Sequence, residues 1–136
     1  MSAIRISNRE RRGLDPSEHV EAKRFMAMVK LHEPRLPALR WLHAQPNGGW
    51  RNKTVAAKLK AEGVRPGVHD YSWPFKVGEH SGLYIELKSR TGRPSPDQRE
   101  FGAFVESQGF KVVYARGWEE AWRAVCEYAG LPYRVT

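Results

Sequence analysis

The sequence predicts an α/β fold in which helices pack against a central sheet. Helical and strand patterns alternate along most of the chain, which is the order expected of an α/β sheet protein. The length of 136 residues suits one hydrophobic core and is too short for two full domains. Hydrophobic residues make up 40% of the chain and charged residues 28%, which is enough apolar material for a folded core.

Charge and cysteine content restrict the partners and the compartment. Lys and Arg number 23 against 15 Asp and Glu, and this net charge of +8 favours a polyanion such as nucleic acid or an anionic membrane surface. Cys126 is the only cysteine, so we expect no intrachain disulfide, no Cys-based zinc site and a reducing compartment. No apolar run approaches the roughly 18 residues that cross a bilayer, and we expect a cytoplasmic protein without a membrane partner.

The sequence of the N-terminal part indicates a flexible arm followed by a helix. Residues 1–14 carry four arginines and little that can be buried, so we expect a flexible basic arm before a single domain at 15–136. The DPSE motif that follows has the capping pattern of a helix start and predicts a helix at 16–32. Glu18 lies on its inward-facing stripe, whereas Glu21 is rotated away and is the weaker candidate for an interior role.

The remaining elements follow from periodicity and turn signals. The run at 82–88 alternates apolar and polar residues, and we expect its polar face, which carries Glu86 and Lys88, to point to solvent. An SPDQ capping box, with Gln98 as its last residue, predicts the start of the helix that follows. We expect strands at 39–45, 69–75, 82–88 and 110–115, and helices at 52–62, 95–109 and 118–130.

Two carboxylates and a lysine form the most informative constellation. Because side chains alternate along a strand, Glu86 and Lys88 emerge from one face with Cα atoms roughly 6.6 to 6.8 Å apart. If the strand that begins near Asp70 pairs with 82–88 as a hairpin, Asp70 lies beside Glu86. Two carboxylates about 4 Å apart repel by roughly 4 kcal/mol at an effective dielectric of about 20, and a divalent cation turns that repulsion into affinity.

Hard oxygen ligands suit Mg²⁺ or Mn²⁺, and the backbone carbonyl of Leu87 would complete the protein's share of the coordination. The alternative interpretation is that these residues are solvated surface charges. In that case Glu86 and Lys88 form an ordinary surface pair worth less than about 1 kcal/mol. The spacing alone leaves both interpretations open.

The sequence motifs around Asp70, Glu86 and Lys88 resemble those of a known protein family. The segments PGVHD, GLYIELK, GRPSPDQ and QGFKVVYARGWEEA strongly resemble the VRR-NUC branch of the PD-(D/E)XK nuclease superfamily. The PNGG loop and NKTVAAKLKAEGVRPG look like its small stand-alone phage and bacterial members. The resemblance covers approximately residues 17–131, and it implies a restriction-endonuclease-like core in which a mixed central sheet is flanked by helices.

The resemblance also implies roles for single residues. Asp70 matches the first metal-binding aspartate, Glu86 the second acidic ligand and Lys88 the catalytic lysine. Glu18 is similar to the acidic residue of the first helix and Gln98 to the glutamine after the ExK strand, although capping boxes explain both residues equally well. The PNGG turn would face the active-site cleft, and we expect DNA contacts from Asn47, Arg51, Lys53, Lys58 and Lys60.

One position departs from the pattern, because His69 stands where the motif usually has proline. The resemblance implies a Mg²⁺- or Mn²⁺-dependent, structure-selective DNA endonuclease of a bacterial or phage-infected cell. We expect it to act on branched DNA as a homodimer that resolves four-way junctions. The alternative is a catalytically silent basic module, either a nucleic-acid-binding protein or a viral accessory protein.

Overall fold

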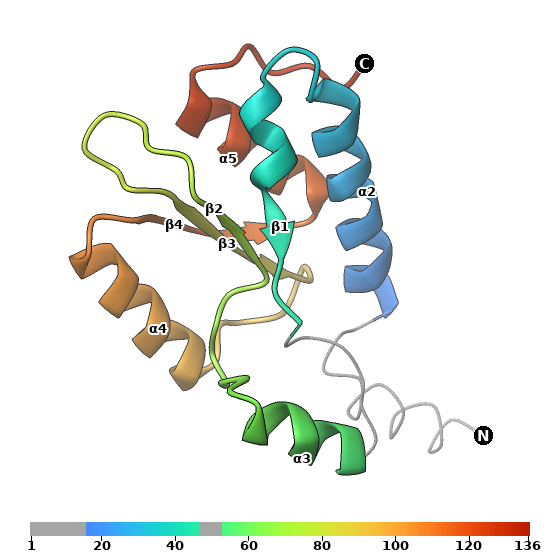
Figure 1. Cartoon of the computed structure of the whole chain (residues 1–136). Coiled ribbons are helices and arrows are strands. Elements are labelled where there is room, and N and C mark those ends of the chain that lie inside the picture. Colours follow the sequence, from blue (N-terminus) through green and yellow to red (C-terminus); the bar gives the residue numbers. More distant parts are fainter. Residues whose placement is uncertain (1–15, 47–52) are drawn as a thin grey trace.

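A mixed four-stranded sheet lies at the centre of the computed structural model, which describes residues 16–46 and 53–136 (Figure 1). The strands are ordered β1-β2-β3-β4. The first three strands pair antiparallel, whereas β3 and β4 are parallel. The strands are β1 (His43–Ala44), β2 (Tyr71–Trp73), β3 (Leu83–Lys88) and β4 (Lys111–Arg116).

Helices cover both faces of this sheet. The helices of the described residues are α2 (Pro16–His32), α3 (Lys53–Ala61), α4 (Pro96–Ser107) and α5 (Trp118–Ala129), with a 3-10 helix η1 (Pro37–Trp41). In Figure 1, α2, α5 and η1 lie on one side of the sheet and α4 on the other. The expected α/β architecture, a mixed sheet flanked by helices, is therefore confirmed.

The main core lies between the sheet and the α2–α5 layer. Its buried residues include Phe25 of α2, Ile85 and Leu87 of β3, and Trp122 of α5. Because side chains alternate along a strand, the odd-numbered residues of β3 point into this core and the even-numbered ones point toward α4. Glu86 is one of the latter.

The helix at 16–32 and the strands and helices after residue 82 are close to their predicted positions. The strand expected at 39–45 is wrong, because the chain forms η1 there and only the two residues of β1 pair with β2. Pro37 begins the 3-10 helix, and Leu42 N–H donates to Leu39 O at 3.1 Å in its last turn.

The strand expected at 69–75 is shorter than predicted. Pro74 lacks a backbone N–H and ends β2, after which Phe75 N–H donates to Trp73 O at 2.8 Å in a tight turn. The predicted arm at 1–14 and the first residue of the DPSE capping pattern, Asp15, lie outside the described residues. Among the described residues, no helix is long and apolar enough to cross a membrane.

The β2–β3 hairpin brings the expected acidic residues together. Its register pairs Tyr71 with Ile85 and Trp73 with Leu83, so Asp70, one residue before β2, stands opposite Glu86. The face of β3 that carries Glu86 does not point to solvent, because α4 packs over it and leaves Glu86 only 3% exposed. The expectation of a solvent-facing side is therefore wrong, and so is the alternative of exposed surface charges.

Candidate active site

Asp70, Glu86 and Lys88 meet at the end of the β2–β3 hairpin. Lys88 Nζ lies 3.3 Å from Glu86 Oε2. Asp70 Oδ2 accepts a hydrogen bond from Leu87 N–H at 2.8 Å, which fixes its carboxylate against the edge of β3. The carboxyl groups of Asp70 and Glu86 are close enough to share a hydrogen bond when one of them is protonated.

Burial makes these carboxyls unusually weak acids. Desolvation, followed by the neighbouring Asp70, raises the pKa of Glu86 to about 8, against the attraction of Lys88. Burial also raises the pKa of Asp70, although the hydrogen bond from Leu87 opposes the shift. Without a cation, this pair therefore holds a proton at neutral pH.

Gln98 fills both of the roles that the sequence indicated, closing a capping box and contacting the site. Its Nε2 donates to Glu86 Oε2 at 2.8 Å, so it orients the carboxylate. Its Oε1 accepts from Ser95 N–H at 2.9 Å, while its own N–H donates to Ser95 Oγ at 3.2 Å. The capping box that begins α4 thus holds the side chain that contacts Glu86.

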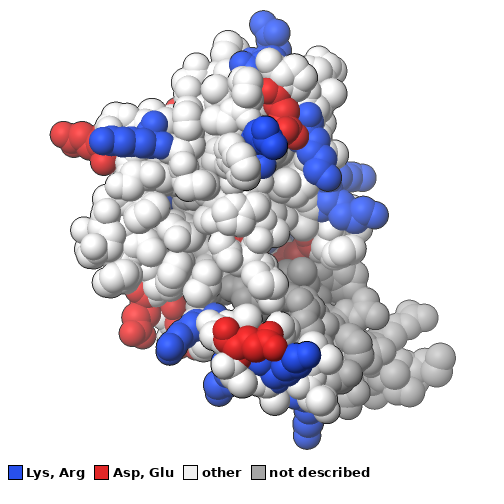
Figure 2. Space-filling view, in the orientation of Figure 1, with Lys and Arg blue, Asp and Glu red and all other residues white. Residues whose placement is uncertain are grey.

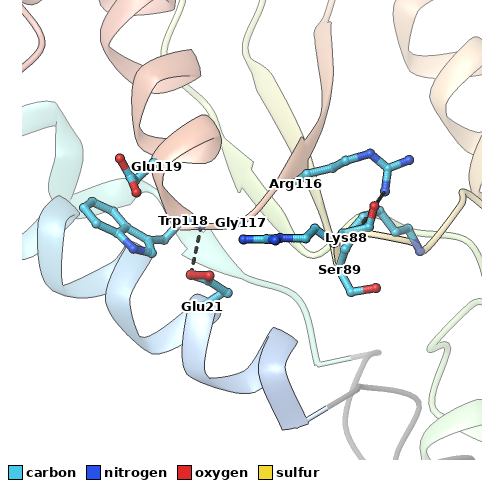
Figure 3. A pocket seen from close by; sticks show the side chains of 8 residues that line it. Glu21, Lys88, Ser89, Arg116, Gly117, Trp118 and Glu119 are labelled. Carbon is cyan, nitrogen blue, oxygen red and sulfur yellow. Dashed lines mark hydrogen bonds between the residues drawn. The ribbon is translucent and has the colours of Figure 1, made fainter.

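The two glutamates of α2 have separate partners. Glu18 Oε1 accepts a hydrogen bond from Ser89 N–H at 2.8 Å, directly after Lys88. Glu21 Oε2 accepts from Trp118 N–H at 3.2 Å (Figure 3), and so caps α5, whose N-cap Gly117 has no side chain. Glu18 is therefore the one that supports the end of β3.

A pocket of about 450 Å³ continues the site beyond Lys88. Figure 3 shows it between the start of α5, the end of β3 and α2. Arg116 Nη1 donates to the carbonyl oxygens of Ser89, Arg90 and Gly92 at 2.8, 2.9 and 2.7 Å, and these bonds fix the loop after β3. Lys88, Arg90 and Arg116 give the lining positive charge, which Glu21 and Glu119 partly balance.

His69 belongs to this site, which sequence reasoning did not foresee. Its Nδ1 lies 3.5 Å from Glu86 Oε1, and its ring is completely buried. Burial lowers the pKa of His69 to about 4, although the backbone of Gly67 opposes the shift, so the ring is neutral at physiological pH. In the sequence, only its position directly before Asp70 indicated that His69 lies at the site. The sequence did not show that α4 covers this side of the sheet and buries the histidine.

The expected DNA contacts are only partly described. Lys53, Lys58 and Lys60 are exposed on α3, a helix without a buried residue. In Figure 2 the lower edge of the molecule, where α3 lies, carries several Lys and Arg side chains. Asn47 and Arg51 lie outside the described residues.

The donors at the site fit a hard divalent cation. Among the described residues no three His, Cys, Asp or Glu side chains gather as a metal cluster. The backbone carbonyl of Lys88 accepts a hydrogen bond from the N–H of Gly117, which follows β4. Successive residues of a strand direct their backbone groups to opposite edges, so the carbonyl of Leu87 faces the other edge of β3, toward Asp70. Asp70, Glu86 and the Leu87 carbonyl together offer the oxygen ligands that Mg²⁺ and Mn²⁺ prefer.

Comparison with known proteins places the fold. No family model matches the sequence, and neither does any curated protein. Among solved structures, a protein described as a VRR_NUC domain protein is similar, with a TM-score of 0.66 and 23% sequence identity. The similarity covers 82% of this chain and 88% of that chain, so it extends over nearly the whole fold.

The carboxyl pair predicts how stability depends on pH. The pKa of Glu86 is about 8 in the folded chain and 4.5 ordinarily, so folding retains a proton over this range and stability falls as pH rises toward 8. His69, with a pKa of about 4 against 6.5, acts in the opposite direction only below pH 6.5. In EDTA, we expect the free energy of unfolding from urea titrations to decline between about pH 6.5 and 8.

The Glu86→Gln variant is the matched control, because it keeps the shape and removes the titrating group. Its free energy of unfolding should decline less over the same range. A wild-type free energy that is constant or increases from pH 6.5 to 8 would contradict the raised pKa of Glu86.

Proposed function

We propose that this protein is a DNA endonuclease that depends on Mg²⁺ or Mn²⁺. The observation that carries the proposal is the cluster of Asp70, Glu86 and Lys88, with two desolvated carboxyls and an amine at one point of the sheet. The structural similarity to a VRR_NUC domain protein supports it. The net charge of +8 fits a polyanionic substrate.

In this proposal Asp70, Glu86 and the Leu87 carbonyl would hold the metal ion, which would neutralise phosphate charge and lower the pKa of a water molecule. Water would attack the phosphorus and release one proton to solvent, the bond from phosphorus to the leaving oxygen would break, and the leaving oxygen would take up a proton from solvent. Lys88 Nζ lies 3.3 Å from Glu86 Oε2, where it would orient or deprotonate the attacking water or stabilise the charge of the phosphate. Gln98 fixes the orientation of Glu86, and Glu18 fixes the backbone after Lys88.

The surfaces on either side of the site provide the path for the DNA backbone. Lys88, Arg90 and Arg116 line the pocket on one side, and their charge favours a phosphate there. The exposed lysines of α3 offer further phosphate contacts. Such contacts read no base edges, so we propose that the enzyme selects DNA by structure.

Loss of any of the three central side chains should abolish cleavage. We expect Asp70→Ala, Glu86→Ala and Lys88→Ala each to lower the rate at least about 10²-fold, because each removes several kcal/mol of transition-state stabilisation. Mg²⁺ and Mn²⁺ should support cleavage, whereas Ca²⁺ should support DNA binding only, since its larger and irregular coordination positions water poorly. Gel assays of nicking, with gel-shift assays of binding, measure both.

Glu79→Ala and Lys111→Ala are matched controls, since both residues are exposed and belong to the hairpin loop and the start of β4, at the other end of the sheet. Both should cut like the wild type. Full activity of Asp70→Ala, or robust cleavage in EDTA, would contradict the mechanism. DNA binding without cleavage in every metal would instead support the catalytically silent module.

The lysines of α3 should contribute to DNA affinity through phosphate contacts. We expect Lys58→Gln with Lys60→Gln to weaken binding and to reduce the slope of log K against log salt by up to about 2, one for each lost phosphate contact. Lys76→Gln with Lys111→Gln removes the same charge at the far end of the sheet. If both pairs weaken binding equally, the effect is one of net charge, and α3 is not the contact.

We propose that two copies act together on branched DNA. One chain carries a single cluster, whereas symmetric cuts in a four-way junction need two, and a two-fold dimer matches the symmetry of that substrate. Two chains of charge +8 repel, so their contact needs apolar surface. Trp41 is 60% exposed and is the most exposed tryptophan among the described residues, which makes it a candidate for that contact.

We therefore expect paired nicks in four-way junctions and much slower cutting of linear duplex of the same sequence. Light scattering should give about twice the chain mass of 15.6 kDa. Trp41→Ser should shift the mass toward the monomer and convert paired cuts to single nicks. A monomeric mass would contradict the proposed homodimer, and equal cutting of linear and branched DNA would contradict the proposed selectivity for four-way junctions.

A further inference from the structure

His69 is a buried polar side chain that the proposed mechanism does not use. It directly precedes Asp70 in the chain, and none of its surface is exposed. The rings of Tyr84, Phe101 and Tyr114 surround it, with centroid distances of 6.4, 5.2 and 5.1 Å. This aromatic environment leaves the imidazole little freedom to turn, so packing fixes its orientation.

The imidazole faces the carboxylate of Glu86. The distance from His69 Nδ1 to Glu86 Oε1 is 3.5 Å, and within the described parts of the chain neither atom makes a hydrogen bond of ordinary geometry, although the backbone of Gly67 also lies near the ring. Buried polar atoms seldom remain unpaired. Here a potential donor and an acceptor face each other at a separation only a few tenths of an ångström above the ordinary hydrogen-bond length.

α4 holds the histidine from the other side through Gly102. A Cβ at this buried helical position would lie 3.2 Å from His69 Nε2 and would overlap the hydroxyl of Tyr114. Glycine is unfavourable inside a helix, so its use here is explained by the close approach of these two side chains. The helix that provides Gln98 to Glu86 Oε2 thus also confines the residue that faces Oε1.

We propose, on the basis of the proposed function, that His69 is a positioning residue for Glu86. With a proton on Nδ1, the imidazole would donate a hydrogen bond to Glu86 Oε1, the oxygen that it faces. His69 then contacts one oxygen of Glu86 and Gln98 contacts the other, so the two side chains orient the carboxyl group toward a metal ion. Residues that orient metal ligands in this way typically change metal affinity about 10- to 100-fold.

The test compares variants with and without the donor. Asn places an amide N–H near the position of His Nδ1, whereas Leu fills similar space without a donor. We expect His69→Leu to weaken Mn²⁺ binding by the full chain, measured by electron paramagnetic resonance without DNA, at least about 10-fold. His69→Asn should remain within about threefold of the wild type, and His69→Met serves as the donor-free variant if His69→Leu does not fold.

Free energies of unfolding in EDTA separate positioning from a structural role. A structural role predicts that Mn²⁺ affinity falls in proportion to lost stability in both variants. Equal affinity of the donor-free variant and the wild type, or an equal loss in His69→Asn, overturns this inference and leaves the proposed function intact. If wild-type protein binds no Mn²⁺, the proposed function fails together with the inference.

Discussion

The burial of the Glu86 carboxyl is the constraint on which the rest of the site depends. Removing a carboxylate from water costs several kcal/mol unless charges and hydrogen bonds compensate. Lys88 on the same strand and Gln98 on α4 provide part of this compensation, and the proton that the raised pKa retains provides the rest, whereas Asp70 across the hairpin adds to the cost. The site is thus formed around a charge that is unfavourable in the absence of a cation.

Side chains from distant elements support the surrounding backbone. α2 contributes Glu18 to the chain directly after β3 and Glu21 to the first turn of α5, one helical turn apart. Arg116, at the end of β4, binds three carbonyls of the loop after β3. The ends of β3 and β4 are therefore fixed by partners in other layers, so the positions of the central side chains depend on the whole fold.

The strands around the site were predictable because their signals are local. Alternation at 82–88 located Glu86 and Lys88 on one face, and a short hairpin placed Asp70 opposite. The burial of that face was not predictable, since it depends on α4, which packs there from a later part of the sequence. The dual role of Gln98 stayed ambiguous for the same reason, and the 3-10 helix at 37–41 was missed because a short alternating run does not distinguish it from a strand.

This arrangement links ligand binding to stability. In the free protein the carboxyl pair compensates its burial with a retained proton, which it loses as pH rises. A bound cation would replace that proton and stabilise the folded chain by mass action, because the unfolded chain has no such site. Apolar side chains in place of Glu86 would make a more stable core, so a carboxyl buried beneath α4 costs stability that a bound cation would offset.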